Sequence, residues 1–138
     1  MIQINELRIG NLVYDQKTDL VMIKSIAQNG INIKYPSGFA DYGFEEIYPK
    51  RLTEKILVMC GFEKRKEPDS PPDCENIFRY VKDNRIIFRG EYLGEAYLKF
   101  RHGSYEQGRY NVVDLKSVHQ LQNLWFSLTG QELETQLW

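Results

Sequence analysis

The sequence is poor in the residues on which many enzymes and metal sites depend. Its 138 residues include two cysteines, Cys60 and Cys74, and two histidines, His102 and His119. Two thiols are too few for a disulfide framework, and neither lies in the CxxC or Cys/His spacing of a zinc site. We therefore expect reduced thiols, no bound metal and no cofactor.

A long apolar segment and a large net charge are also missing. No window approaches the roughly 18 apolar residues of a membrane span, and residues 1–6 lack the basic and apolar regions of a leader. The 18 basic and 19 acidic residues nearly cancel, so no overall field draws the chain to nucleic acid or to anionic lipid. We expect a cytoplasmic protein without a membrane partner, whose low net charge mildly favours self-association.

The composition that is present, with 42% apolar and 13% aromatic residues, is typical of a globular protein. The first half has short apolar runs separated by turn residues such as Asn29-Gly30 and Pro36-Ser37-Gly38. Strands this short favour a small curled sheet, which is a barrel or a strongly bent sheet, and the alternative is a plain antiparallel sheet. The predicted strands are Leu7 to Tyr14, Leu20 to Ile26, Ile31 to Tyr35 and Phe44 to Tyr48, with Ile9, Val13, Val21, Ile23, Ile31 and Ile33 pointing inward.

A short helix and a charged segment follow. Thr53 is a good N-cap and Gly61 a good C′ residue, which predicts a helix from Thr53 to Cys60. Residues 63–75 carry many charges and three prolines, which predicts an exposed loop. The loop either links two small domains or connects two parts of one domain. We favour the single domain, 1–138, with residues 1–62 and 76–138 as its two sub-structures.

The second half has the pattern of an antiparallel meander followed by a helix. The two-residue connection Asp83-Asn84 suits a type I′ turn and predicts a hairpin. Ser117 and Gln120 predict a capping box, and Gly130 ends the helix. We expect the helix to pack across the meander, which makes the whole fold α+β. The predicted strands are Asn76 to Lys82, Arg85 to Arg89, Glu95 to Arg101 and Arg109 to Asp114, and the apolar helix face is Val118, Leu121, Leu124, Trp125 and Leu128.

No catalytic constellation emerges from these residues. A histidine that acts as a general base needs a carboxylate beside it in space, and the sequence does not place one there. We expect His102 in a turn and His119 at an exposed or capping position, and burial of Cys60 would raise the pKa of its thiol. The glycines are not placed to cradle a phosphate, and the prolines of the charged loop oppose a calcium site. We expect a protein that is not an enzyme.

The meander mixes cations with aromatic residues. Residues 76–111 hold seven basic and four acidic side chains among eight phenylalanines and tyrosines. A sheet face with aromatic rings between arginines can stack unpaired bases and hold phosphates. Packing inside an antiparallel sheet explains the same composition, so nucleic-acid binding is the alternative function. The residues that would carry it are Arg79, Arg85, Arg89, Arg101, Tyr80 and Phe88.

A second aromatic group lies in the first half. Tyr35, Phe39, Tyr42 and Phe44 surround Pro36 and Gly38. They either form an exposed cluster for a protein contact or close the bottom of the curled sheet. Because the chain lacks chemistry and is rich in aromatics, the main expectation is a non-enzymatic protein-interaction module, with a partner protein or a second copy at this cluster.

Three segments carry a resemblance: Ile4 to Tyr14, Leu52 to Glu63 and Val118 to Leu133. Through them the chain resembles a group of small uncharacterised proteins encoded in gut-bacterial genomes, prophages and mobile elements. The resemblance spans nearly the whole length and implies an accessory role in a mobile-element or prophage-associated system, with no site residue. Arg8 to Tyr14 is also similar to the opening of SH3-like barrels, which bind peptides, nucleic acids or other subunits.

Overall fold

The structure is a computed structural model that describes residues 2–17, 19–66, 77–83, 86–92, 98–106 and 109–136. The chain forms two units: one contains Met1–Arg51 and Ser117–Leu133, the other Leu52–Lys116 and Glu134–Leu137. Each holds one antiparallel sheet and one α-helix, so the predicted α+β class is confirmed. The units differ from the suggested halves 1–62 and 76–138, and the single domain stays a prediction. Residues 67–75 of the predicted loop lie outside the described residues.

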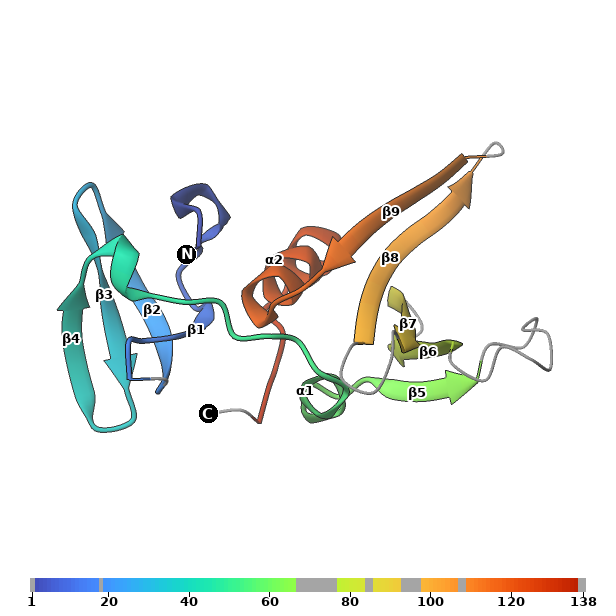
Figure 1. Cartoon of the computed structure of the whole chain (residues 1–138), viewed down its shortest axis with the longest axis horizontal. Helices are drawn as coiled ribbons and strands as arrows, with labels where there is room; N and C mark the ends of the chain where they lie inside the picture. Colours follow the sequence, from blue (N-terminus) through green and yellow to red (C-terminus); the bar gives the residue numbers. More distant parts are fainter. Residues whose placement is uncertain are drawn as a thin grey trace. The chain divides into compact units, whose positions relative to one another are not determined.

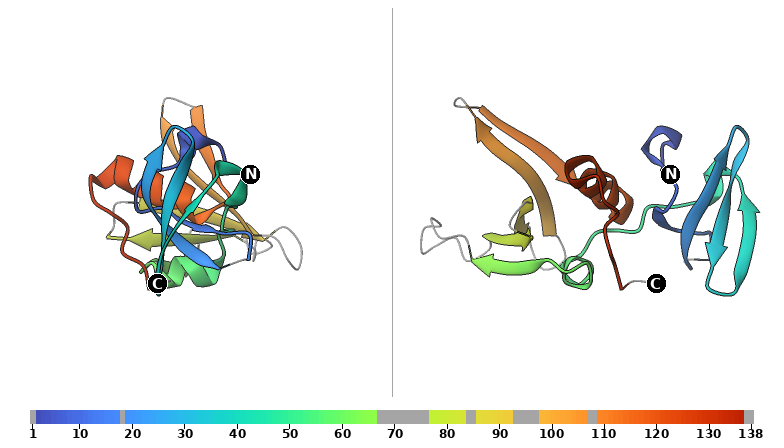
Figure 2. Two further views of the ribbon diagram at one scale, coloured as in Figure 1. Left: turned by 90° about the vertical axis from the view of Figure 1, so that its left-hand side faces the viewer. Right: turned by 180° about the vertical axis from the view of Figure 1, so that it is seen from behind.

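In the first unit four strands follow one another in the order β1-β2-β3-β4, each antiparallel to the next (Figure 1). After the last strand Tyr48 pairs with Tyr14 on the free side of β1. β4 lies at the opposite edge, as both Figure 1 and Figure 2 show. The sheet is not closed into a barrel, so the SH3-like barrel is not confirmed. The elements are the 3-10 helix η1 (Ile4–Glu6), β1 (Leu12–Tyr14), β2 (Leu20–Ala27), β3 (Gly30–Tyr35), β4 (Gly38–Tyr42) and the 3-10 helix η2 (Phe44–Glu46).

The last strand of this sheet was predicted in the wrong place. The strand is Gly38–Tyr42, and the segment that begins at Phe44 starts with a 3-10 turn instead. The backbone N–H of Gly43 donates to Oε2 of Glu46 at 2.7 Å, which stabilises this turn. Each segment carries two aromatics, Phe39 and Tyr42 in one and Phe44 and Tyr48 in the other, so the aromatic content alone could not decide between them.

One face of the sheet forms the core of the first unit. Five of the six residues predicted to point inward are buried. The exception is Ile9, which is 59% exposed because β1 begins only at Leu12. Burial at alternate positions of β2 and β3 is what an antiparallel sheet with one covered face requires. The buried core residues are Ile2, Leu7, Val13, Val21, Ile23, Ile31, Ile33 and Ile47.

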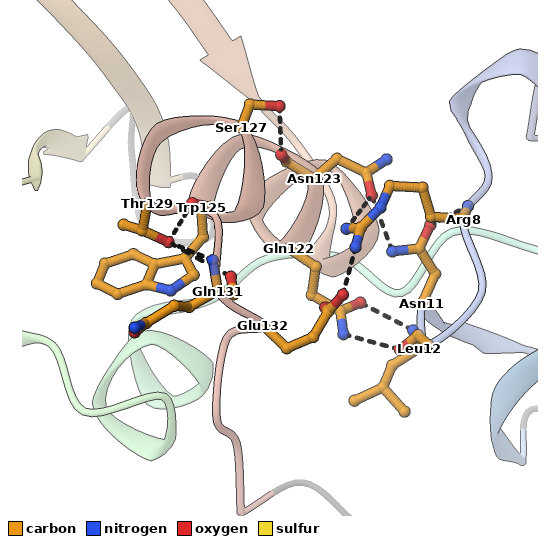
Figure 3. A network of polar contacts seen from close by, with 11 residues as sticks. Arg8, Asn11, Leu12, Gln122, Asn123, Trp125, Ser127, Thr129, Gln131 and Glu132 are labelled. Carbon is orange, nitrogen blue, oxygen red and sulfur yellow. Dashed lines mark hydrogen bonds and ion pairs between the residues drawn. The ribbon is translucent and has the colours of Figure 1, made fainter.

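Helix α2 (Val118–Thr129) belongs to the first unit, whereas the sequence predicted that it packs across the meander. Amide side chains dock it onto the segment before β1 (Figure 3). Gln122 accepts a hydrogen bond from the N–H of Leu12 at 2.8 Å and donates to the carbonyl of Gly10 at 3.1 Å. Asn123 donates to the carbonyl of Glu6 at 2.6 Å. The helix is therefore held by backbone groups more than 100 positions away in the sequence.

The buried face of α2 differs from its apolar pattern. Val118, Leu121 and Trp125 are buried as predicted, but Leu128 is 51% exposed and the polar Gln122 is buried. The predicted capping box is wrong, because the side chain of Ser117 makes no capping hydrogen bond. Gly130 ends the helix as predicted, with φ of 70° and its N–H bonded to the carbonyl of Phe126 at 2.8 Å.

The second unit contains a five-stranded antiparallel meander in the order β5-β6-β7-β8-β9. The prediction had four strands and placed residues 63–66 in the loop. This charged run is an edge strand, where charges oppose pairing with another chain. The predicted hairpin is confirmed, but Lys82 pairs with Ile86, so three residues rather than two connect the strands. The strands are β5 (Glu63–Lys66), β6 (Ile77–Lys82), β7 (Ile86–Tyr92), β8 (Leu98–Glu106) and β9 (Arg109–Leu115).

Helix α1 (Glu54–Met59) has both predicted ends. Thr53 Oγ1 accepts a hydrogen bond from the N–H of Ile56 at 3.3 Å. At the other end Gly61 has φ of +85°, and its N–H bonds to the carbonyl of Val58 at 3.0 Å. The N–H of Phe62 bonds to the carbonyl of Leu57, also at 3.0 Å. These two bonds are those of a Schellman motif, so the local signals were sufficient here.

Candidate interaction surface

The structure brings His119 to a carboxylate, but not in a catalytic arrangement. His119 is 1% exposed, and its Nε2 lies 3.4 Å from Oε2 of Glu6 and 3.5 Å from Oγ of Ser117. In a Ser-His-acid triad the hydroxyl and the carboxylate bind opposite ring nitrogens. Here both approach Nε2, and Nδ1 has no hydrogen-bond partner among the described residues. Because His119 is buried, the expected exposed or capping position is wrong. Burial also lowers the pKa of His119, although Glu6 opposes this shift.

The other histidine and the cysteines do not form a reactive site among the described residues either. His102 lies inside β8, where it pairs with Phe88 and Val113, and not in a turn. Cys60 is buried, and burial raises the pKa of its thiol, as expected. Cys74 lies outside the described residues. Within the described ranges, no three His, Cys, Asp or Glu side chains gather to hold a metal ion.

The meander places three of the four predicted arginines in one row. Arg79 pairs with Arg89, and Arg89 pairs with Arg101. Arg65 of β5 pairs with Arg79 and extends the row, although it lay in the predicted loop. Paired positions of neighbouring strands share a face of the sheet, so four strands contribute to an arginine row of Arg65, Arg79, Arg89 and Arg101. Arg85 lies outside the described residues.

The predicted aromatic partners do not share that face. Tyr80 follows Arg79 and Phe88 precedes Arg89, and successive residues of a strand face opposite sides of the sheet. Tyr80 and Phe88 pair with each other. Tyr80 is fully buried, which makes it unsuitable for stacking on a base. The backbone register therefore separates the arginine row from Tyr80 and Phe88.

Of the four aromatics predicted for a protein contact, the structure exposes one. Phe39 of β4 is 66% exposed. Tyr35, Tyr42 and Phe44 are partly buried and pack against the core of the first unit. These three therefore do what the alternative reading expected, which is to close one side of the sheet.

Hydrogen bonds hold two of the packed tyrosines in place. The hydroxyl of Tyr35 donates to Oδ2 of Asp15 at 2.6 Å and lies 2.7 Å from the hydroxyl of Tyr42. The backbone N–H groups of Lys17 and Asp19 also donate to Asp15, at 2.9 and 2.8 Å. Burial raises the pKa of Asp15, but these hydrogen bonds outweigh it and the net pKa is lowered. Burial and the bond to Asp15 raise the pKa of Tyr35.

Strand register shows which residues share the outer face with Phe39. Phe39 pairs with Lys34, Lys34 with Met22, and Met22 with Leu12, in one row across the four strands. Beside it runs a second row, in which Tyr14 pairs with Tyr48 and with Leu20. Leu12 is fully buried, whereas Phe39 and Tyr48 are 66% and 43% exposed. We call Tyr14, Leu20, Met22, Phe39 and Tyr48 the apolar outer face.

This composition is unusual for a solvated sheet face. An antiparallel sheet with one face in water normally alternates apolar residues inside with polar residues outside. Here the row across the four strands carries one charged side chain, Lys34, between Met22 and Phe39, and the polar pair Asn32 and Asp41 follows on the same face. The Nζ of Lys50 lies 4.3 Å from the centre of the Tyr14 ring, a cation–π contact. Sequence reasoning missed this face because it used the alternation to find the core and did not examine the other side.

Comparison with known proteins gives no function for the apolar outer face. In the part of the chain that the structure describes, no helix has the length and apolar character needed to cross a membrane. No protein-family model matches the chain, and neither a curated protein nor a solved structure matches it.

Proposed function

We propose that this protein is a non-enzymatic interaction module whose apolar outer face binds an extended segment of a partner protein. The observation that carries the proposal is the exposure of Phe39 in a row with Met22. Burying a phenylalanine side chain contributes about 1.5 to 3 kcal/mol, and a partner that covers Phe39 gains the part that is now exposed. Exposed apolar surface that gathers on one face marks interaction sites, and here the exposed Phe39 and Tyr48 share a face with the half-buried Tyr14, Leu20 and Met22. The resemblance noted above suggests the setting, an accessory role in a mobile-element or prophage-associated system.

Affinity capture with matched variants tests this proposal. The tagged full chain, Phe39→Ser and Ile9→Ser are each used to capture partners from the host cytoplasm. Ile9 is a suitable control because it is 59% exposed but precedes β1 and is not part of the outer face. We expect a partner that the wild type and Ile9→Ser retain and that Phe39→Ser loses at least tenfold. Equal retention by all three chains, or no partner for the wild type, would contradict the proposal.

The arginine row supports a second candidate function, binding of a nucleic-acid backbone. Like charges at directly paired positions are destabilising, so the paired arginines gain from an anion along the row. Two acidic residues already compensate the ends of the row, because Asp114 pairs with Arg101 and Glu63 lies 3.0 Å from Arg65. The row adds Arg65 to the arginines predicted from the sequence. With Tyr80 and Phe88 on the opposite face, such binding would depend on phosphates more than on stacking with these two rings.

Fluorescence anisotropy with labelled single-stranded RNA and DNA tests the second candidate. We expect binding near 50 mM salt that falls by orders of magnitude near 200 mM, because phosphate contacts release counterions. The double variant Arg79→Gln/Arg89→Gln should weaken it at least tenfold, and Lys24→Gln, at an exposed site of the other sheet, should not. Flat titration curves at 50 mM salt would exclude this function.

A further inference from the structure

We propose that β4 is a strand-addition site, at which an extended segment of a partner protein pairs antiparallel with the open edge. The segment places a cationic residue opposite Asp41 and an apolar residue opposite Phe39. The inference rests on the proposed function, since it states how the partner reaches the apolar outer face. It adds the binding mode and the chemical pattern of the partner.

The register of the β3-β4 hairpin shows which backbone groups face the open edge. Tyr35 and Gly38 flank the two-residue turn between these strands and pair with each other. The pair that flanks a two-residue turn is hydrogen bonded, and such pairs alternate with non-bonded pairs along an antiparallel ladder. Gly38, Ala40 and Tyr42 therefore direct their backbone groups to β3. Phe39 and Asp41 direct theirs to the open edge.

This edge lacks the usual protection against pairing. Natural sheets protect their edges with lysines, prolines, bulges or a covering element. β4 has the sequence Gly-Phe-Ala-Asp-Tyr, without lysine or proline, and its register with β3 shows no bulge. β5, an edge strand of the other sheet, has the sequence Glu-Lys-Arg-Lys. β4 therefore lacks the lysines that protect β5. β9, the other edge strand of the meander, also lacks lysine and proline, but β4 is the edge strand that carries the exposed Phe39.

The side chains of β4 favour a foreign segment over a second copy. If two copies paired over the full length of β4, with Ala40 opposite Ala40, the carboxylate of Asp41 would lie against the ring of Phe39. A foreign strand can instead place lysine or arginine opposite Asp41 and an apolar side chain opposite Phe39, and such cross-strand pairs are favourable. In an antiparallel strand the cation comes two residues before the apolar residue.

The surroundings of Asp41 fit a cation. Asp41 is exposed, and its Oδ1 accepts a hydrogen bond from Nδ2 of Asn32 at 2.8 Å, which fixes the carboxylate on the outer face. Beside it is an open hollow of about 450 Å3, lined by Asp41, Asn32 and Ser25 among others. A long cationic side chain can lie in this hollow and keep its charged group hydrated. The apolar outer face provides the complementary site for the second side chain.

Two labelled peptides and two variants of one residue test the inference. The peptides TTRVFTT and TTEVFTT differ only in the residue that would face Asp41. Asp41→Pro removes the outward N–H, which an edge strand tolerates, and Asp41→Ala keeps the N–H but removes the carboxylate. Binding is measured by fluorescence anisotropy, and hydrogen exchange of the Phe39 and Asp41 amides is followed by NMR. Melting temperatures of both variants confirm that they are folded.

We expect TTRVFTT to bind the wild type at least tenfold more tightly than TTEVFTT and to slow exchange of both amides. Asp41→Ala should bind the two peptides about equally, and Asp41→Pro should bind both at least tenfold more weakly than Asp41→Ala. Equal binding of the peptides to the wild type, or equal binding by the two folded variants, overturns strand addition. So does self-association of the wild type that Asp41→Pro abolishes, because a second copy then occupies the edge. If strand addition fails while Phe39→Ser still loses a captured partner, the proposed function stands without it.

Discussion

Replacing Gln122 by methionine should lower the stability of the first unit, because two backbone groups lose their hydrogen-bond partner. Methionine keeps the length of the side chain and is a good helix former, so the change removes mainly the two amide hydrogen bonds. The N–H of Leu12 and the carbonyl of Gly10 then lose the partners that bond them at 2.8 and 3.1 Å. A buried polar group left without a partner costs about 1 to 3 kcal/mol. Because Leu12 is fully buried, we expect the free energy of unfolding of this unit to fall by about 2 to 4 kcal/mol.

Two measurements check this expectation. Urea denaturation followed by tryptophan fluorescence reports on the first unit through Trp125, which is buried in α2. Hydrogen exchange of the Leu12 amide should accelerate about 30- to 900-fold, since 1.36 kcal/mol corresponds to a factor of ten. Gln131→Met is the control, because Gln131 is exposed after the end of the helix. A loss below about 0.5 kcal/mol, with unchanged exchange at Leu12, would show that this amide does not hold α2 in place.

Three further perturbations test other parts of the first unit. Burial holds the pKa of His119 below the ordinary value of a histidine, which is about 6.5. The unfolded chain therefore binds the proton more tightly, and the free energy of unfolding should fall as the pH drops below about 6.5. His119→Gln should reduce this fall in urea titrations at about pH 7.5 and 5.5. The pKa of Asp15 is lowered in the folded chain, so its contribution is present above the unfolded pKa and is lost as the pH falls through the folded one. Tyr35→Phe removes one cause of that shift and should shrink the acid-induced loss of stability, and an unchanged acid profile would count against this bond. In Gly30→Ala the new Cβ would lie 2.7 Å from the carbonyl oxygen of Tyr42, so calorimetry should show a loss of about 1 to 3 kcal/mol, and a neutral result would mean that the hairpin relaxes freely.

Local signals predicted local structure well. Both ends of α1 depend on residues within six positions of one another, and the N-cap at Thr53 and the Schellman ending at Gly61 are confirmed. The docking of α2 could not be found in this way. It depends on amide groups of Gln122 and Asn123 that meet backbone groups 110 or more positions away. The apolar pattern of the helix does not say which sheet it covers.

The candidate surfaces show the same difference between features that local sequence predicts and features that depend on strand pairing. The aromatic content of the segment after Pro36 directed attention to Phe39, which is exposed. Strand pairing was needed to find that Met22 and Tyr48 lie on the same face and that Tyr35 lies on the other. The arginine row likewise depends on register, and no reading of single strands could have aligned Arg65 with the others. Charged residues are also typical of loops, which is why β5 was missed.

The division of the first unit between the two ends of the chain affects its synthesis on the ribosome. Residues 1–51 emerge first, but the helix that binds them lies within 117–133. At about 5 to 20 residues per second, the remaining residues up to 133 take about 4 to 16 s to be made. During that interval the amide of Leu12 lacks the glutamine that will bond it. A factor that binds incomplete chains can act during these seconds. It would bind the same four strands that later carry the apolar outer face.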